Sequence, residues 1–290
     1  MGPVMRRAAI GLVAVLAIGA GGIVAIRIVD GRSDATLRDE LLAASSGVPA
    51  PPFAPAMVHG LPEPARRFFL FAIESGTPLR TAAAIKMAGE LSLGTRDDPR
   101  YQDMRAEQVL APPFGFVWQV RTGGAMRVTG SDALGPARSW SRFRILNGVP
   151  VGRVGHDRDH RRSSFGRMVG EGLFWTPAAF LPAADAGRDL IEWHGVDTDT
   201  AEVRVRVGDM DQSARVTVDS AGRPLRVQFQ RWSNENDERI YRLQPFGGDL
   251  SEFETFGGFR LPTRITGGNH YGTDLYHPFF KAKVGAVTFF

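Results

Sequence analysis

The chain has 290 residues, of which 43% are hydrophobic and 10% aromatic, so it is long enough to bury a full core. It contains no cysteine, which excludes disulfide scaffolds, thiolate catalysis and cysteine-ligated metals. Its formal charge of +4 does not indicate a nucleic-acid partner, because the arginines are scattered among 31 acidic residues and form no block beyond residues 160–162.

The first thirty residues predict a membrane anchor. Arg6 and Arg7 precede an uncharged run over residues 8–26, and a helix of that length spans roughly 30 Å, the thickness of a bilayer core. Small residues over 17–20 leave a cleaved signal peptide as the alternative. We favour an uncleaved single-pass helix in the cell membrane. The order of charge and apolar run is that of an export signal, which predicts that the C-terminal part lies on the extracytoplasmic side.

The residues after the anchor predict a second short segment. Leu37, Leu41 and Leu42 form an apolar stripe that indicates a juxtamembrane helix over 33–46, ended by Gly47. Residues 48–55 are rich in proline and predict an extended spacer that lifts the domain off the bilayer. We therefore divide the chain into an anchor (1–30), a helix with its linker (31–57) and an exported sheet domain (58–290).

The sheet domain begins with an amphipathic helix and continues mainly as strands. The apolar stripe of residues 61–74 predicts a helix, and Ser163 or Ser164 is expected to cap another that ends near Phe174, followed by a short turn over 177–181. Residues 214–218 and 225–229 form the clearest hairpin, with one apolar and one polar face. Alternation predicts strands at 84–93, 104–110, 115–121, 125–129, 138–146, 190–196, 201–207, 213–219, 224–232, 238–244, 250–256, 259–267 and 283–290.

These elements predict an α+β fold. A curved, largely antiparallel sheet, or half-barrel, packs on helices and follows one transmembrane helix. Standard catalytic and cofactor motifs are absent, including the Walker loop, His-Glu-x-x-His and Gly-x-Ser-x-Gly. We therefore expect no cofactor.

Two histidine clusters suggest chemistry. His156 and His160 flank acidic residues and are candidates for a zinc site, but the composition favours a solvated connection and we predict no metal. His270 and Asp274 are candidates for an acid and base pair, with His277 nearby. The alternative is a polar hairpin loop whose side chains cap their own turns.

Aromatic side chains provide the third signal. Phe114, Phe116 and Trp118 are expected on one face of a strand, because side chains alternate with a period of two. Such a face either packs into an ordinary core or lines an apolar cavity in a strongly curved sheet. The candidate ligand-binding residues are Phe114, Phe116, Trp118, Trp140, Trp175, Trp193 and Trp232.

Four separated segments carry a resemblance to a known family. They are LPEPARRF (61–68), FGFVW (114–118), GLFWTPAAFLP (172–182) and GFRLP (258–262). In this order they resemble a bacterial domain-of-unknown-function family with an N-terminal membrane segment, over roughly residues 58–290. The resemblance implies a layout similar to the periplasmic lipoprotein-carrier (LolA/LolB-like) half-barrel. It assigns no activity and no catalytic residue.

Three functions follow as hypotheses. The first is a membrane-anchored protein that binds a lipid, an acyl chain or a lipoprotein in an apolar cavity. The second is an envelope hydrolase that uses His270 and Asp274, and the third is an interaction scaffold without a ligand. Binding is favoured over catalysis because aromatics are plentiful and no acid, base or nucleophile has a specific spacing.

Overall fold

One large antiparallel sheet organises the molecule. The computed structural model describes residues 3–47, 49–146, 148–182 and 191–290, and the side chains of residue 19 and of residues 21 onward within those ranges. Within these residues the strands form one thirteen-stranded sheet in the order β6-β5-β4-β3-β2-β1-β13-β12-β11-β10-β9-β8-β7. The chain thus builds the two halves of the sheet separately and joins them where β1 pairs with β13.

Most elements agree with the predicted alternation, but the strand expected at 125–129 lies instead at 129–134. The helices are α1 (Pro3–Ser46), α2 (Glu63–Ala72) and α3 (Arg158–Trp175), with 3-10 turns η1 (Pro55–Val58) and η2 (Pro177–Phe180). The strands are β1 (Ala83–Ser92), β2 (Tyr101–Ala111), β3 (Gly115–Thr122), β4 (Thr129–Leu134), β5 (Ser139–Ile145), β6 (Val149–Gly155), β7 (Ile191–Gly195), β8 (Thr200–Val207), β9 (Met210–Val218), β10 (Pro224–Ser233), β11 (Arg242–Phe256), β12 (Phe259–Asn269) and β13 (His277–Phe289).

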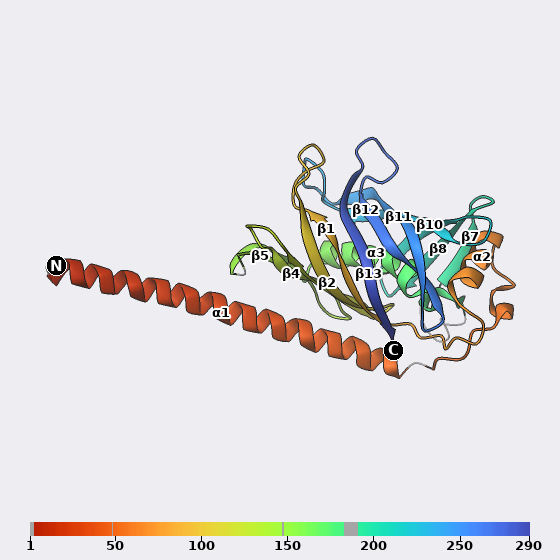
Figure 1. Cartoon of the computed structure of the whole chain (residues 1–290), viewed down its shortest axis with the longest axis horizontal. Helices are drawn as coiled ribbons and strands as arrows, with labels where there is room; N and C mark the ends of the chain where they lie inside the picture. Colours follow the sequence, from red (N-terminus) through yellow and green to blue (C-terminus); the bar gives the residue numbers. More distant parts are fainter. Residues whose placement is uncertain (1–2, 48, 147, 183–190) are drawn as a thin grey trace.

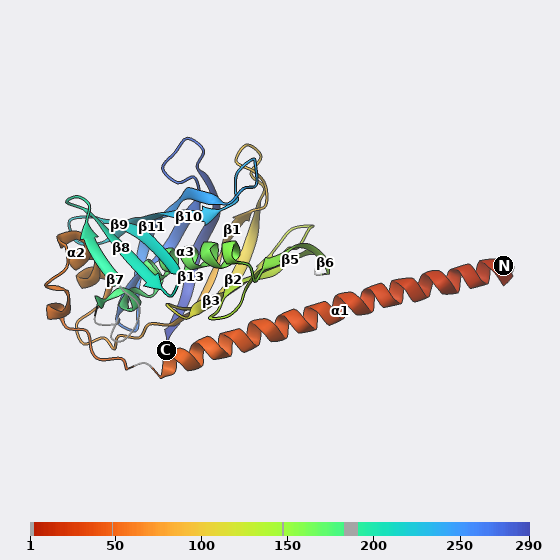
Figure 2. The same ribbon diagram turned by 180° about the vertical axis from the view of Figure 1, so that it is seen from behind.

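The sheet curves around α3, which lies along its concave face (Figures 1 and 2). Phe165, Met168 and Leu173 of this helix are buried in the main core together with inward-facing side chains of both halves of the sheet. At the other end of the sheet, α2 buries Phe68 and Phe69 against Trp193 of β7. The expected curved antiparallel sheet packed on helices is therefore confirmed.

The C-terminal half of α1 packs on the opposite face of the sheet. Its buried side chains include Leu37 and Leu41, which form a second apolar cluster with Val109, Val117 and Trp140. The helix expected over 33–46 is thus the end of a longer helix. Because α1 covers this face, the strands around β3 are buried on both sides.

Buried ion pairs fix α1 against the sheet. Asp30 is 4% exposed and lies against Arg142, Arg144 and Arg153 of β5 and β6, with a distance of 2.6 Å between Arg153 Nη1 and Asp30 Oδ2. One turn further along α1, Asp34 accepts hydrogen bonds from Ser131, Gln119 and Trp140. Burial raises the pKa of the Asp34 carboxyl, although these hydrogen bonds oppose the shift.

The proline-rich stretch after α1 packs onto the sheet domain. Phe53 is buried in the main core, and its backbone N–H donates to the carbonyl of Thr77 over 2.8 Å. An isolated bridge joins Pro52 to Pro78. These contacts hold the segment against the domain, in contrast to the spacer that its composition suggested. The division of the chain after residues 30 and 57 stays a prediction.

The membrane anchor also stays a prediction. Across the part of the chain that the structure describes, we find no helix with the length and apolar character needed to cross a bilayer. Most of the predicted span, residues 8–26, lies outside the residues whose side chains are described.

Several local expectations were wrong. The cap of α3 is Asp157, whose carboxylate accepts the backbone N–H of His160, so the helix begins before Ser163 and Ser164. Strand β6 was missed, because its side chains are mostly exposed and show no alternation. The strands expected at 238–244 and 250–256 form one strand, β11, in which Glu252 has a φ of 53° and interrupts the alternation.

The Asp30 ion pairs predict a large effect on stability. We expect Asp30→Asn to lower the free energy of unfolding by about 3 kcal/mol, because it leaves buried arginines beside a neutral amide. Urea unfolding of the full chain, followed by tryptophan fluorescence, measures this change. Asp39→Asn on the same helix is the control, since its pair with Arg38 is exposed and is worth less than about 1 kcal/mol. Equal losses in both variants would contradict the role of Asp30.

Candidate ligand-binding site

A partly open cavity lies between α3 and the concave face of the sheet. We call it the sheet cavity; it has a volume of about 210 Å³ and is bounded by described residues. Its apolar walls come from Leu91, Trp118, Phe143, Phe174, Trp175, Val227, Phe229, Phe246, Leu250, Ile265, Phe279 and Phe280. Asp132, Arg167, Glu171 and Arg231 are its charged lining residues. The cavity therefore combines aromatic walls with a small group of ionisable side chains.

Glycines let the helix and the strands approach each other around the sheet cavity. A Cβ atom at Gly170 of α3 would overlap the ring of Phe229 on β10. At Gly248 of β11, a Cβ would come within 2.6 Å of the carbonyl oxygen of Thr266 on β12. These positions tolerate no side chain, so the aromatic rings around them define the cavity walls.

Arg167 organises the polar wall of the sheet cavity. Its guanidinium donates to Asp132 Oδ2 over 2.5 Å and to Glu171 Oε1 over 2.7 Å. Gln108 of β2 donates to the other oxygen of Glu171 over 2.6 Å. Burial opposes the charged form of Arg167, but Glu171 and Asp132 outweigh it and raise its pKa. The helix and the sheet are thus joined by an ion-pair network.

A buried histidine extends this network without forming a catalytic triad. His160 lies 2.9 Å from Ser139 Oγ through Nδ1 and 2.9 Å from Ser141 Oγ through Nε2. The hydroxyl of Ser141 donates to Asp132, so its proton is not available to the imidazole. A nucleophilic serine would instead donate to the histidine. Burial lowers the pKa of His160, although Asp132 and Asp157 oppose the shift. The arrangement favours a neutral, structural histidine.

Arg231 is the charged group of the sheet cavity that lacks a counter-ion. Its guanidinium lies 5.0 Å above the ring of Phe246, and its buried Nε has no hydrogen-bond acceptor. Among the described residues, no carboxylate oxygen lies within 4.0 Å of it. Burial and the charge of Arg167 lower the pKa of Arg231, with Asp132 and Glu171 acting in the opposite direction. An arginine remains protonated at neutral pH nonetheless.

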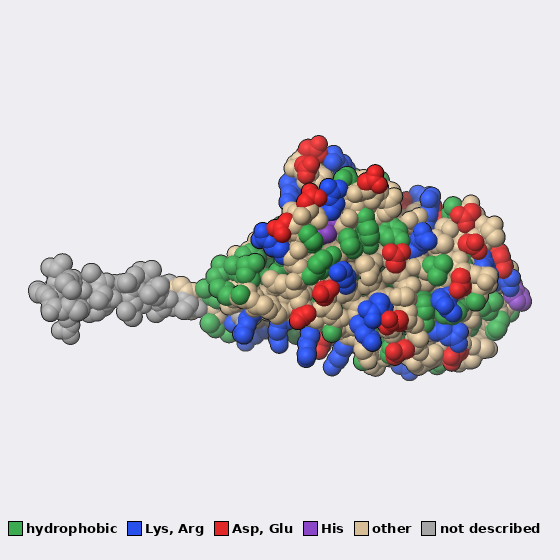
Figure 3. Space-filling model, turned by 45° about the horizontal axis from the view of Figure 1, so that its top comes forward, with side chains coloured by type: hydrophobic (Ala, Val, Ile, Leu, Met, Phe, Trp, Pro, Cys, Tyr) green, Lys and Arg blue, Asp and Glu red, His purple; other side chains and the backbone are tan. Residues whose placement is uncertain are grey.

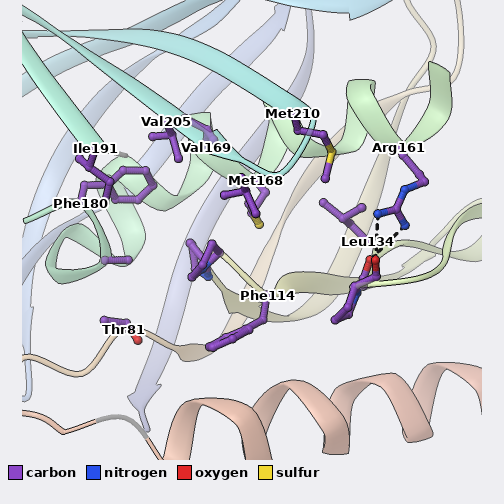
Figure 4. A pocket seen from close by; sticks show the side chains of 16 residues that line it. Thr81, Phe114, Leu134, Arg161, Met168, Val169, Phe180, Ile191, Val205 and Met210 are labelled. Atoms are coloured by element: carbon purple, nitrogen blue, oxygen red, sulfur yellow. Dashed lines mark hydrogen bonds between the residues drawn. The ribbon is translucent and has the colours of Figure 1, made fainter. Parts of the chain in front are cut away.

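A second, larger pocket lies on the other side of α3. Figure 4 shows it between β7–β9, α3 and the turns that flank β3 and β4, with Phe114 and Leu134 on one wall and Ile191 and Val205 on the other. Its volume is about 650 Å³. Arg161 at its rim donates to the carbonyls of Gly135 and Pro136. Its wall includes Ile191, which directly follows residues 183–190, a segment outside the described residues.

The aromatic residues singled out from the sequence do not form a single site. Trp118 and Trp175 line the sheet cavity, and Phe116 lies buried beneath Arg167. Phe114 lies in the turn before β3 and packs on the α1 side, because Gly115 has a φ of 144° and the strand begins only there. The expectation that Phe114 shares a face with Phe116 and Trp118 was therefore wrong.

The remaining tryptophans have other partners. Trp140 lies on the opposite face of the sheet, where its indole donates to Asp34. Trp193 packs on α2 and donates to the carbonyl of Phe180. Trp232 donates to Asp159 and stacks on Tyr241. These side chains stabilise the fold at separate places.

The histidine clusters do not assemble into a site. His270 Nε2 lies 3.2 Å from the carbonyl oxygen of Glu235, and no hydrogen bond within the described residues joins it to Asp274, which is exposed. His277 lies 3.3 Å from Ser92 Oγ, and His156 is exposed. In the described ranges, no group of three or more histidine and acidic side chains is placed to hold a metal ion.

Sequence reasoning missed the charged residues of the sheet cavity, although a signal for one of them exists. Val227, Phe229 and Arg231 alternate along β10, so all of them face inward. A charged residue at an inward-facing position of an apolar strand is rare unless it has a buried partner or a function. The pairing of Arg167 with Glu171 follows similarly from their i,i+4 spacing on α3.

Comparisons with known proteins give a family and two distant structural similarities. A family model described as "Family of unknown function (DUF6544)" matches residues 51–282, and no curated protein matches the chain. The backbone is similar to that of a LolA superfamily protein from Nitrosomonas europaea, with 12% identity and a TM-score of 0.42 over 78% of this chain and 91% of that one. An outer membrane lipoprotein-sorting protein domain from Vibrio parahaemolyticus is similar at 10% identity and a TM-score of 0.34, over 72% of this chain and 85% of that one.

The buried His160 predicts a specific pH dependence of stability. Because burial lowers its pKa in the folded state, the unfolded chain binds a proton first as pH falls below about 6.5. The contribution of His160 to the free energy of unfolding is therefore complete above that pH and is lost as the pH falls toward the folded-state pKa of His160. His160→Gln should flatten the change in unfolding free energy between about pH 7 and pH 5.

Urea unfolding at several pH values measures this slope. His59→Gln is the control, because His59 is exposed and lies outside the polar network. An unchanged slope in His160→Gln would rule out a neutral, buried His160.

Proposed function

The chain belongs to the DUF6544 family, whose function is unknown, and we propose that it binds the acyl chain of a lipid or of a lipidated protein in the sheet cavity. The observation that carries this proposal is the cavity itself, a partly open space walled by aromatic and aliphatic side chains within the sheet domain. Ordinary cores leave few voids larger than a water molecule. An apolar cleft or cavity with a few convergent polar groups is the usual form of a small-molecule site.

The size of the sheet cavity favours a narrow ligand. Its volume of about 210 Å³ lies below the range of roughly 300–1,000 Å³ that is common for small-molecule pockets. A single hydrocarbon chain fits such a space better than a sterol or a folded peptide. Its methylene groups would replace the missing contacts of Trp118, Phe229 and Phe280, since each buried methylene contributes about 0.8 kcal/mol.

The alternative functions have less support. An envelope hydrolase would place His270 and Asp274 within hydrogen-bond reach in a cleft, and His270 instead faces a backbone carbonyl. A scaffold without a ligand leaves the sheet cavity and its unpaired arginine without a purpose. Binding of an acyl chain accounts for both features.

Membrane attachment through residues 8–26, with the sheet domain on the extracytoplasmic side, forms part of the proposal. Support comes from the end of the domain where α1 leaves it, at which hydrophobic side chains gather on the surface (Figure 3). Gly148, in the turn between β5 and β6, approaches Ile23 of α1, since a Cβ built on it would lie 3.5 Å from the Ile23 side chain. Exposed apolar residues around this contact are Val24, Ile28, Val29, Leu146, Val149, Val151 and Val154. This surface fits the apolar boundary of a bilayer.

Native mass spectrometry tests the binding proposal. The full chain, extracted in a nonionic detergent and released in the spectrometer, should retain a lipid or another acyl species. Leu250→Trp should lower the retained fraction at least about tenfold, because the larger side chain fills the sheet cavity. Leu243→Trp is a matched control on the same strand, since Leu243 is 51% exposed whereas Leu250 is 5% exposed. Equal retention by both variants, or a wild-type chain without any acyl species, would count against the proposal.

Site-specific labelling tests the position of the domain on the membrane. Because the chain has no cysteine, Val151→Cys can be labelled alone with an environment-sensitive fluorophore in liposomes. Spin-labelled lipid should quench this label strongly. The same label at Val196→Cys, an exposed position just after β7, should be quenched weakly. Similar quenching at both positions would contradict a membrane-facing β5–β6 hairpin.

A further inference from the structure

The guanidinium group of Arg231 is a cation without a counter-ion at the edge of an apolar space. Its side chain is half-buried and its Nε is inaccessible to solvent, so water at the surface cannot satisfy the whole group. Phe246 stacks on the guanidinium at 5.0 Å but offers no hydrogen-bond acceptor. A buried donor without an acceptor is costly and is uncommon in native structures.

The nearby carboxylates are already engaged. Asp132 accepts from Ser141 through Oδ1 and from Arg167 through Oδ2. Glu171 accepts from Arg167 through Oε1 and from Gln108 through Oε2. Each carboxylate oxygen of the polar wall therefore has a donor without Arg231. Arg231 would have to share one of these oxygens with its present donor, and in the structure it lies within ion-pair distance of neither carboxylate.

Other unpaired donors border the same cavity. The indole N–H groups of Trp118 and Trp175 are buried and have no acceptor, and both side chains line the sheet cavity. The buried N–H groups of Arg142 and Arg144 that lack hydrogen bonds are different, because those guanidinium groups lie against the Asp30 carboxylate. Three buried N–H donors without an acceptor, those of Arg231, Trp118 and Trp175, thus border the sheet cavity.

We propose that the ligand of the sheet cavity is an amphiphile with an anionic head group, a carboxylate or a phosphate, which is bound by Arg231 while the hydrocarbon tail occupies the aromatic interior. This inference rests on the proposed function and names the chemical class of its ligand. Arginine binds both anions through a planar pair of N–H donors. The half-buried position of Arg231 puts the head group at the boundary of the cavity, where a larger substituent has access to solvent.

Three probes with the same hydrocarbon tail separate the contribution of the head group to binding from that of the tail. Dodecanoate, dodecyl phosphate and dodecanol are each equilibrated by dialysis with the full chain in phosphatidylcholine nanodiscs, and empty nanodiscs give the blank. We expect the two anions to bind about 10- to 100-fold more tightly than the alcohol, as is usual for hydrogen bonds to charged groups. The stronger of the two anions distinguishes a fatty-acid carboxylate from a lipid phosphate.

A matched pair of variants assigns the effect to Arg231. Arg231→Gln should weaken binding of the preferred anion about 10- to 100-fold and should change the dissociation constant of dodecanol less than about threefold. Retained binding of dodecanol also reports that the variant is folded. Arg226→Gln is the control, because Arg226 is an exposed arginine on the same strand, outside the sheet cavity.

The outcomes separate this inference from the proposed function. Equal affinity of the wild-type chain for dodecanoate, dodecyl phosphate and dodecanol would overturn the anionic head group and leave acyl-chain binding intact. An unchanged preference in Arg231→Gln would also overturn it. Failure of the chain to bind any of the probes would overturn both.

Discussion

Coverage of the concave face of one large sheet is the constraint on which the rest of the structure depends. Thirteen strands spaced by roughly 4.8 Å span roughly 58 Å, whereas the 18 residues of α3 give a helix of about 27 Å. One helix cannot cover such a face. The sheet therefore curves around α3, and α2 covers the strands from β7 to β9. On the other side of α3, aromatic side chains close the surface incompletely, and the sheet cavity is the space that they leave.

The same constraint explains why the segment after the proposed anchor belongs to the fold. The outer face of the strands around β3 carries Val109, Val117 and Trp140, which would be exposed without α1. Leu37 and Leu41 cover them. Asp30 continues this stripe two turns before Leu37 and forms ion pairs with β5 and β6. Apolar and charged contacts both fix α1 to the sheet, so the domain keeps one orientation relative to this helix. The domain is thus carried by a rigid connection.

Much of the sheet followed from the sequence because its signal is local. The predicted hairpin of β9 and β10 is present, with Val216 opposite Val227, since alternation and a turn determine a strand pair by themselves. The face occupied by α1 was not predictable in the same way. Asp30 and Asp34 lie on the same helical stripe as Leu37 and Leu41. In the sequence alone, acidic residues on such a stripe indicate a solvent-exposed face. Only the fold shows that arginines of distant strands lie beside them. The positions of the aromatic residues were mispredicted for a related reason. The core, the cavity wall and the sheet edge all contain the same types of aromatic side chain.

The charged wall of the sheet cavity is best understood as a balance between positioning and binding. A buried ion-pair network contributes little net stability compared with apolar residues of the same shape, so its value lies elsewhere. Arg167, Asp132 and Glu171 join α3 to β4, and through Gln108 to β2, which fixes the helix at one height above the sheet. With the helix held there, Gly170 maintains close contact with Phe229, and the opposite wall cannot close over the remaining space. Arg231 then lines a cavity in which its Nε has no hydrogen-bond acceptor, and an anionic amphiphile would supply both this acceptor and the missing apolar contacts.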